Sequence, residues 1–321
     1  MAKTRVTPVS NSSNIFNGID IYYILMLIKD LIVMHVKFWV YFVEAIVKTF
    51  LPQEEVNVKS QSVLITGTGH GIGKELALKY AALGAKVLCW DINEKNNAQT
   101  VKEIKSAGGI AHAYVCNVMN RTEINELAEK MKKEHGFISV IINNAGIMPC
   151  HPLLQTTEAE IRNLFEINVL AHFWIIQAFL PEMIEKNTGH IVALSSCAGL
   201  FGLKNLVPYC GTKFAVRGYM LALAEELRAA NPENKIKLTT IYPYMVDTGL
   251  CKKPHSRFPK LMKLVTIKEA ATAIVNAQRT GVEETSIPKH FIYIDKIGRI
   301  IPKNCMRTVN DFLDTGVHSD S

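Results

Sequence analysis

The sequence has few of the features that mark a disulfide scaffold, a zinc site or a nucleic-acid-binding protein. Its seven cysteines are an odd number and contain no Cys-x-x-Cys pair. Most lie in apolar surroundings, as small core residues do, so we expect a reducing compartment. No compact block of arginine and lysine is interleaved with aromatic residues, which argues against nucleic-acid binding. Low-complexity tracts and solenoid-type repeats are also missing.

The chain instead has enough apolar sequence for a full globular core. Of its 321 residues, 48% are hydrophobic and 20% are charged, a balance that argues against bulk disorder. This length suits a single doubly wound α/β domain with added termini. The 36 basic and 29 acidic residues give a net charge of +7. Such a mild excess fits an ordinary solvated surface or a preference for anionic lipid headgroups.

The N-terminal part contains a long apolar segment. Residues 1–18 read as a polar tail, and we expect no signal peptide, because the apolar stretch begins late and no small-residue cleavage site follows it. Residues 19–51 are long enough to cross a bilayer, but charges interrupt them within roughly 100° of one helix face. These charges are Lys29, Asp30, Lys37, Glu44 and Lys48. We therefore expect an anchor that lies in the interface of a membrane or lipid droplet, or one that enters and leaves it on the same side. The alternatives are a helix that spans the bilayer, a helix that packs against the enzyme and a helix that forms a dimer.

The rest of the chain alternates between strand-like and helix-like segments. Pro52 ends the anchor, residues 52–60 read as a linker, 61–300 as the main domain and 301–321 as a C-terminal tail. The strand candidates are Ser62–Thr66, Lys86–Trp90, Ala111–Cys116, Ser139–Asn143, His190–Ser195, Ile236–Ile241 and His290–Ile294. Seven strands with intervening helices predict a doubly wound parallel sheet, a Rossmann fold, covered by helices on both faces.

Two features predict a dinucleotide site. The run Thr66-Gly67-Thr68-Gly69-His70-Gly71-Ile72-Gly73 follows a strand and opens a helix. Glycines there let the backbone approach a pyrophosphate, and the helix N-terminus favours its charge. Asp91 follows the next strand, where a carboxylate accepts hydrogen bonds from ribose hydroxyls and repels a 2′-phosphate. No arginine follows it, so we expect NAD in preference to NADP; a helix N-cap is an alternative or additional role for Asp91.

Two further features predict proton transfer. Tyr209 and Lys213 share a helix face at i and i+4. A lysine ammonium beside a phenol stabilises the phenolate and lowers its pKa, so Tyr209 could exchange a proton with a substrate hydroxyl or carbonyl. Ser195 and Ser196 end a strand at the edge of the sheet where ligands bind, and a hydroxyl there can hold a developing alkoxide. Each motif alone arises often by chance, but they occur together and in a consistent order.

Taken together, the stretch from about residue 61 to 295 resembles the short-chain dehydrogenase/reductase family. It carries Asn143-Asn144-Ala145-Gly146 after the fourth strand, and Ser196 lies 13 residues before Tyr209. The resemblance implies that Tyr209 is the general acid/base, Lys213 lowers its pKa, Ser196 orients the reacting oxygen and Asn168 holds a water in a proton relay. It further implies a cofactor site formed by Gly67, His70, Gly71, Ile72, Gly73, Asp91, Asn117, Val118, Asn144, Ala145, Gly146, Tyr209, Lys213, Pro243, Val246 and Thr248.

Two positions depart from the common pattern of this family. Position 117 is Asn where many relatives have Asp, and an amide can still bond adenine. Position 244 is Tyr where many have Gly after Pro, which we expect to narrow the substrate pocket. No clustered metal ligands are evident, and we expect no metal. After the sixth strand, residues 249–265 mix basic and apolar side chains, typical of a lid that touches anionic headgroups or of an exposed flexible loop.

A narrower resemblance points to a membrane-associated branch that holds lipid-droplet 17-beta-hydroxysteroid dehydrogenases and epidermal retinol dehydrogenases. His70, Trp90-Asp91-Ile92-Asn93, Ala111-His112-Ala113-Tyr114 and the apolar N-terminal segment carry it. It implies NAD-dependent hydride transfer to or from a retinoid, steroid or fatty alcohol. It also implies a location at the endoplasmic reticulum membrane or lipid droplet, with the catalytic domain facing the cytosol. The resemblance to the wider family implies a homodimer that packs the helix bearing Tyr209 against its twin. A surface protein that binds NAD but mainly recruits partners is the alternative, and an NADPH-dependent reductase is a third.

Overall fold

The chain divides into two compact units, Met1–Glu54 and Glu55–Ser321. The computed structural model describes residues 21–51, 54–259 and 262–320, without the side chains of residues 48–50. The described part of the first unit is the helix α1, Ile21–Phe50. The predicted tail 1–18 and the charge of Lys48 therefore lie outside what the structure describes.

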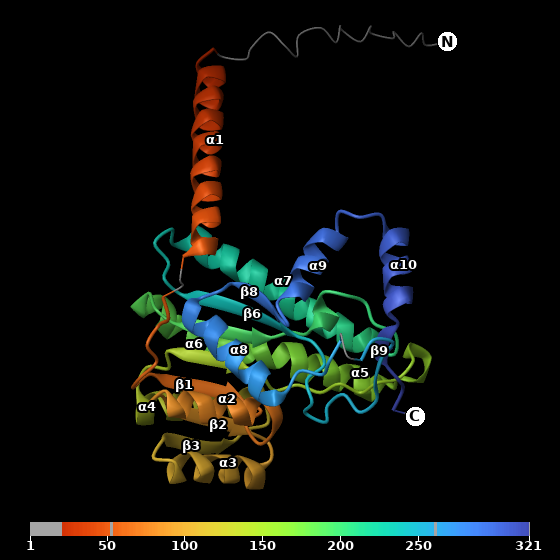
Figure 1. Cartoon of the computed structure of the whole chain (residues 1–321). Helices are drawn as coiled ribbons and strands as arrows, with labels where there is room; N and C mark the ends of the chain where they lie inside the picture. The colour runs from red at the N-terminus through yellow and green to blue at the C-terminus, as the bar shows by residue number, and fades with distance from the viewer. Residues whose placement is uncertain (1–20, 52–53, 260–261, 321) are drawn as a thin grey trace, which may run out of the picture. The chain divides into compact units, whose positions relative to one another are not determined.

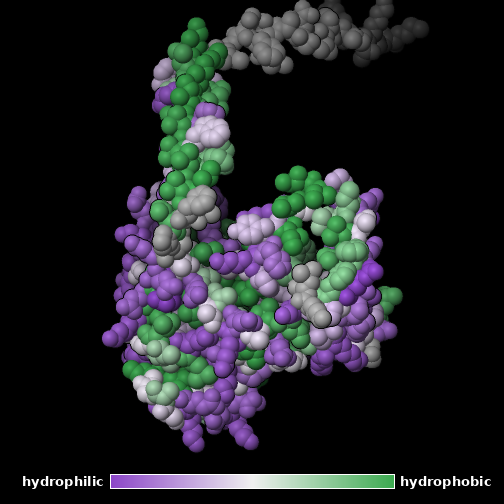
Figure 2. Space-filling view, viewed as in Figure 1, coloured by the Kyte–Doolittle hydropathy of each residue, from purple (hydrophilic) through white to green (hydrophobic). Residues whose placement is uncertain are grey.

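Helix α1 buries none of its side chains from Ile21 to Val47 within its own unit. Its surface is largely hydrophobic (Figure 2). Among the described residues, a different helical stretch, Glu158–Lys186, is long and apolar enough to cross a membrane. That stretch is 44% buried and belongs to the second unit, so core packing accounts for its composition. Charged side chains interrupt α1 more often, as the sequence indicates.

The second unit is built on a seven-stranded parallel sheet in the order β3-β2-β1-β4-β5-β6-β8 (Figure 1). The strands are β1 (Ser62–Thr66), β2 (Lys86–Asp91), β3 (Ile110–Val115), β4 (Val140–Asn143), β5 (His190–Leu194), β6 (Lys237–Pro243) and β8 (Glu284–Ile287). This is the doubly wound topology that the sequence predicts. Its strand order reverses direction between β1 and β4, where such sheets bind ligands.

Helices cover both faces of this sheet. They are α2 (Gly71–Ala82), α3 (Glu94–Ser106), α4 (Arg121–His135), α5 (Glu158–Phe165), α6 (Ala171–Lys186), α7 (Val207–Ala230) and α8 (Ile267–Thr280). Helices α2, α3 and α8 pack with Val63 and Ile65 on one face, and α4, α6 and α7 pack with Leu64 on the other. Alternate strand residues face opposite sides, so nearly continuous apolar strands supply both cores.

Local signals set the ends of several helices. Capping boxes open α5 at Thr157 and Glu160 and α8 at Thr266 and Glu269, which satisfies backbone N–H groups that the helices leave free. Gly281 closes α8 in the left-handed conformation that glycine adopts readily.

The prediction of a strand over His290–Ile294 is wrong. The seventh strand is β8, and residues His290–Gly298 form helix α9. The alternation of large residues resembles a strand, but Phe291, Ile292 and Asp295 are the buried positions, which is helical spacing. Proline at 288 also lacks the N–H that would extend the strand.

The segment 301–321 holds further structure. Helix α10, Lys303–Leu313, is followed by β9, Thr315–Val317. Strand β9 pairs antiparallel with β7, Pro254–Ser256, from the predicted lid. Lys260 and Leu261 of that lid lie outside the described residues.

Candidate active site

A cavity of about 1030 Å³ opens at the carboxyl ends of the parallel strands in the second unit. Every site residue predicted from the sequence except Asn168 lines it. These residues are Gly67, His70, Gly71, Ile72, Gly73, Asp91, Asn117, Val118, Asn144, Ala145, Gly146, Ser196, Tyr209, Lys213, Pro243, Val246 and Thr248. The fold therefore brings together residues that lie between Gly67 and Thr248 in the sequence.

Two glycines of the glycine-rich turn have no room for a side chain. Gly67 has a φ of +74°, and a Cβ on Gly73 would lie 1.9 Å from the carbonyl oxygen of Gly67. Helix α2 begins directly after this turn, and His70 makes no side-chain capping bond to it. The first backbone N–H groups of α2 are thus left facing the cavity, an arrangement that suits an anion such as a pyrophosphate.

Asp91 is held in a fixed orientation beside this turn. Its carboxylate accepts hydrogen bonds from the N–H of Gly69 (2.7 Å) and from the N–H of Asn93 (2.8 Å). The side chain lines the cavity although the residue is only 8% exposed. The N-cap of the following helix α3 is Asn93, not Asp91. The helix-cap interpretation of Asp91 is therefore wrong, and its carboxylate is a wall of the cavity.

The buried side chain of Asn97 supports the glycine-rich turn, a role that was not predicted from the sequence. Its side chain donates to the carbonyls of Cys89 (2.9 Å) and Tyr114 (3.1 Å) and accepts from the Thr68 hydroxyl (2.7 Å). The amide thus joins the ends of β2 and β3 to the glycine turn. A signal was present, because Asn97 falls on the apolar face of α3 with Val101 and Ile104, where a buried polar group requires partners.

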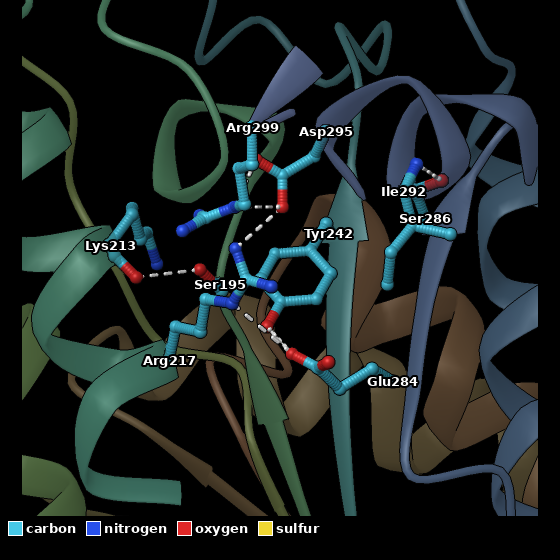
Figure 3. Close-up of polar contacts among 9 residues, drawn as sticks. All are labelled: Ser195, Lys213, Arg217, Tyr242, Glu284, Ser286, Ile292, Asp295 and Arg299. Carbon is cyan, nitrogen blue, oxygen red and sulfur yellow. Dashed lines mark hydrogen bonds and ion pairs between the residues drawn. The ribbon is translucent and has the colours of Figure 1, made fainter. Parts of the chain in front are cut away.

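Tyr209, Lys213 and Ser196 meet where β5 ends against helix α7. Ser195 ties the two elements together, because its hydroxyl donates to the carbonyl of Lys213 (2.8 Å, Figure 3). The Lys213 ammonium donates to the carbonyl of Leu194 (2.8 Å) and lies 5.6 Å from the centre of the Tyr209 ring. Ser196 lines the same cavity, where its hydroxyl donates to the carbonyl of Pro243 (3.5 Å) and accepts from the N–H of Ala198 (3.1 Å). A phenol, an amine and a hydroxyl thus converge on one wall of the cavity.

The pKa of Tyr209 departs from the expectation. Burial raises the pKa of Tyr209, and the Ser196 hydroxyl lowers it only in part. The predicted lowering by Lys213 is not found, because Tyr209 is 6% exposed and loss of hydration of the phenolate outweighs the favourable contacts. Burial also lowers the pKa of Lys213, to about 8. Both groups are therefore pushed towards their neutral forms.

Asn168 lies behind the cavity wall in a π-helical turn, Glu166–Leu170. Its side chain accepts from the N–H of Ile147 (2.9 Å), and its amide donates to the carbonyl of Ile147 (2.9 Å) and to Thr212 (3.3 Å). The residue fixes the loop after β4 against helix α7. π-Helical turns occur frequently at functional sites. The role of Asn168 in a water relay stays a prediction.

Asn144 fixes the floor of the cavity at the β1–β4 junction. Its side chain donates to the carbonyl of Thr66 (2.7 Å), and its own N–H donates to the Thr66 hydroxyl (3.0 Å). Asn117 is held at the end of β3, where it accepts from the N–H of Met119 (3.1 Å). These bonds position both predicted cofactor residues at the edge of the sheet.

The opposite side of the cavity is apolar. Tyr244 stacks on Phe291, with ring centres 4.7 Å apart and planes at 19°. Helices α9 and α10 and the turn between them add residues that were not predicted from the sequence to belong to the site. These are Ile294, Ile297, Ile301, Met306, Val309 and Leu313. They were missed because a strand and a tail were expected there, and the alternating pattern hid their helical spacing.

An ion-pair network centred on the buried Asp295 holds α9 against helix α7 (Figure 3). Arg217 on α7 pairs with Asp295 on α9 (2.8 Å) and with Glu284 on β8 (3.3 Å). Arg299 also pairs with Asp295 (3.0 Å), which is 4% exposed. Ser286 accepts from the N–H of Ile292 (2.9 Å) and fixes the start of α9. The apolar wall is thereby attached to the helix that carries Tyr209.

Comparison with known proteins matches residues 61–257 to the short chain dehydrogenase family model. The chain is 36% identical over 278 residues to short-chain dehydrogenase/reductase family 16C member 6 of Bos taurus, covering 86% of this chain and 88% of that protein. It is 35% identical to 17-beta-hydroxysteroid dehydrogenase 13 of Homo sapiens, over 84% of this chain and 88% of that one. A Burkholderia phymatum short chain dehydrogenase/reductase solved with NAD superposes with a TM-score of 0.68 at 23% identity, covering 75% and 93% of the two chains.

Proposed function

The chain belongs to the short-chain dehydrogenase family and is an NAD(P)-dependent oxidoreductase acting on CH–OH groups; from this premise we propose that it transfers a hydride between NAD and a lipophilic alcohol or its carbonyl. The observation that carries the proposal is the meeting of Ser196, Tyr209 and Lys213 on one wall of a cavity whose opposite wall is apolar. Retinoids, steroids and fatty alcohols are the substrate classes that we propose.

The residues present fit a dinucleotide. The start of α2, which has no side-chain cap, faces the cavity beside a turn that excludes side chains at Gly67 and Gly73, as a pyrophosphate site requires. Asp91 supports NAD over NADP, because a fixed carboxylate repels a 2′-phosphate. The described residues that line the cavity include no arginine to bind such a phosphate. Asn117 and Val118 would flank the adenine, and Pro243, Val246 and Thr248 would line the nicotinamide.

When bound, the nicotinamide supplies the hydride acceptor or donor. Ser196 orients the substrate oxygen by a hydrogen bond, and Tyr209 takes or gives its proton. Because burial raises the pKa of Tyr209, the phenol stays protonated at neutral pH and holds the proton that carbonyl reduction needs. In alcohol oxidation it must first lose one, a step that higher pH favours. We propose alcohol oxidation as the cellular direction, since NAD is mostly oxidised in cells.

We propose that α1 attaches the protein to the endoplasmic reticulum membrane or to lipid droplets, with the second unit facing the cytosol. Exposed apolar side chains along α1, with charges gathered on one face, support attachment in the plane of the interface. The cytosolic orientation predicts no glycan at Asn120, whose side chain already caps helix α4. A glycan at this residue, detected by glycosidase-sensitive mobility, would overturn the orientation.

We also propose a homodimer that packs α7 against its twin. The resemblance to the family suggests this packing, and exposed Phe214 and Leu221 on α7 support it. Light scattering of the detergent-solubilised protein tests it: a dimer that Leu221→Asp dissociates agrees with the proposal, and a monomeric parent protein contradicts it.

The activity is tested by NADH formation from retinol, estradiol and long-chain alcohols, with NAD or NADP, using protein in detergent. We expect a signal with NAD that disappears in Tyr209→Phe, a change that removes only the hydroxyl. Tight NADH binding without turnover across the panel would instead favour a protein that acts by recruiting partners.

A further inference from the structure

Helices α9 and α10 present an apolar outer surface. Helix α10 buries none of its residues, and the turn that joins the helices exposes Ile300 to 86%. Tyr293, Val309 and Phe312 are also about half-exposed. Figure 2 shows a hydrophobic patch over these two helices, above a mostly hydrophilic surface. Soluble proteins seldom gather several large apolar side chains on one exposed turn without a partner. We call residues 290–313 the C-terminal hairpin.

The inner face of the C-terminal hairpin lines the catalytic cavity. Ile294, Ile301 and Met306 lie along its wall. Ile297 and Val309 line the cavity and are also exposed, 58% and 46%, so they lie at the rim where the cavity meets the exterior. The outer face of the hairpin is therefore an exposed apolar surface, and its inner face forms part of the rim of the cavity.

The two helices are held differently. Ser286 fixes the start of α9 through the N–H of Ile292, and Asp295, further along the helix, pairs with Arg217 of α7. At the turn, α9 and α10 meet at Gly298, where an added Cβ would lie 3.2 Å from Met306. At its far end α10 contacts the lid through Phe312 and Phe258, with ring centres 5.3 Å apart. The base is thus attached to α7, and the turn at Ile300 projects from it.

The exposed charge around the hairpin is mostly basic. Basic residues outnumber the exposed acids Asp311 and Asp314, and the predicted lid adds more basic residues beside them. The basic residues are Lys289, Lys296, Arg299, Lys303 and Arg307 in and beside the hairpin, and Lys252, Lys253 and Arg257 in the lid. Each lysine or arginine near an anionic membrane surface contributes attraction, and apolar side chains among them enter the headgroup layer.

We propose that the C-terminal hairpin docks on an anionic phospholipid surface, inserts Tyr293 and Ile300, and forms the entrance through which a lipophilic substrate passes from the lipid into the cavity. This inference rests on the proposed oxidoreductase function and assigns its route of substrate entry. The contact is separate from any attachment by α1, and the two can be measured independently.

A native cysteine allows a direct test. Cys305 on α10 is the cysteine that the described structure exposes most fully. The full chain is labelled there with an environment-sensitive fluorophore and bound to vesicles of phosphatidylcholine with or without phosphatidylserine. The control carries Cys305→Ser and Lys102→Cys, which places the label on α3. We expect lipid-borne quenchers to reach the Cys305 label on anionic vesicles and not the Lys102→Cys label. A Cys305 label that stays open to an aqueous quencher on vesicle-bound protein overturns the proposal.

Kinetics supply the second arm. Tyr293→Ser with Ile300→Ser should raise the KM for a long-chain alcohol in anionic vesicles about ten-fold, because two apolar contacts with lipid are lost. Turnover of a short water-soluble alcohol should not change. Leu154→Ser, at a residue 99% exposed on another loop, is the matched control. Equal KM values for the parent protein and the double variant would overturn the proposal that the hairpin forms the entrance for the substrate. Loss of turnover with every alcohol in the parent protein would instead contradict the proposed function itself.

Discussion

Replacing Lys213 with methionine should stabilise the protein while abolishing its activity. Burial lowers the pKa of Lys213 from 10.5 to about 8. At about 1.4 kcal/mol per pH unit, keeping this ammonium charged at neutral pH destabilises the folded state by about 3 kcal/mol. Methionine removes that penalty and also the charged hydrogen bond to Leu194, which contributes about 2 kcal/mol. The net gain is about 1 kcal/mol, or roughly 2–4 °C in Tm.

The pH dependence distinguishes this explanation from better packing of methionine. The unfolded chain binds a proton at Lys213 up to pH 10.5, whereas the folded protein releases it near pH 8. As the pH rises from about 8 to about 10.5, the free energy of unfolding of the parent protein should therefore increase relative to that of Lys213→Met. The difference in stability between the two proteins should then disappear. Thermal unfolding of both proteins in detergent, at about pH 7 and about pH 9.5, measures this difference. A variant less stable at neutral pH, or a difference that does not change with pH, would refute the reasoning.

Three further predictions follow from the site. Asp91→Asn keeps the shape of the side chain and removes its charge, so kcat/KM with NADP should rise at least ten-fold relative to NAD; an unchanged ratio would show that Asp91 does not select the cofactor. Because burial raises the pKa of Tyr209, alcohol oxidation should accelerate from about pH 6 to about pH 9 while carbonyl reduction does not, and a flat oxidation profile measured under conditions where chemistry is slow would contradict this. Gly73→Ala should abolish NADH binding by calorimetry, because its Cβ would overlap the Gly67 carbonyl, whereas Gly218→Ala, whose Cβ meets nothing within 4 Å, should leave binding intact.

Much of the fold and of the catalytic wall could be predicted from the sequence, because both follow from short-range signals. Six of the strands are apolar runs bounded by turn residues, and the helical spacing of Tyr209 and Lys213 places both on one face. Glycine spacing after β1 predicts the tight turn that Gly73 requires. These features depend on neighbours within a few residues, and a single sequence contains that information.

The features that could not be predicted depend on long-range packing. Residues 290–294 alternate as a strand would, and only the structure, in which Ile292 bonds to Ser286 and the next residue, Asp295, pairs with Arg217, shows that they form a helix. The raised pKa of Tyr209 results from burial by surrounding elements, which the pairing with Lys213 does not reveal. The apolar side of the cavity could not be predicted for the same reason. Helix α10 is distant in sequence from the other lining residues, and only the folding of the chain brings it to the cavity.

The most direct test of the central claim follows a deuterium atom from substrate to cofactor. The protein in anionic vesicles is supplied with NAD and a long-chain alcohol, a retinol or a steroid that carries deuterium on the carbinol carbon, and the nucleotide is analysed by mass spectrometry. Our account predicts deuterated NADH with at least one of these substrates and none from Tyr209→Phe, although both proteins bind NADH. Unlabelled nucleotide from every substrate, with NADH still tightly bound, would contradict it.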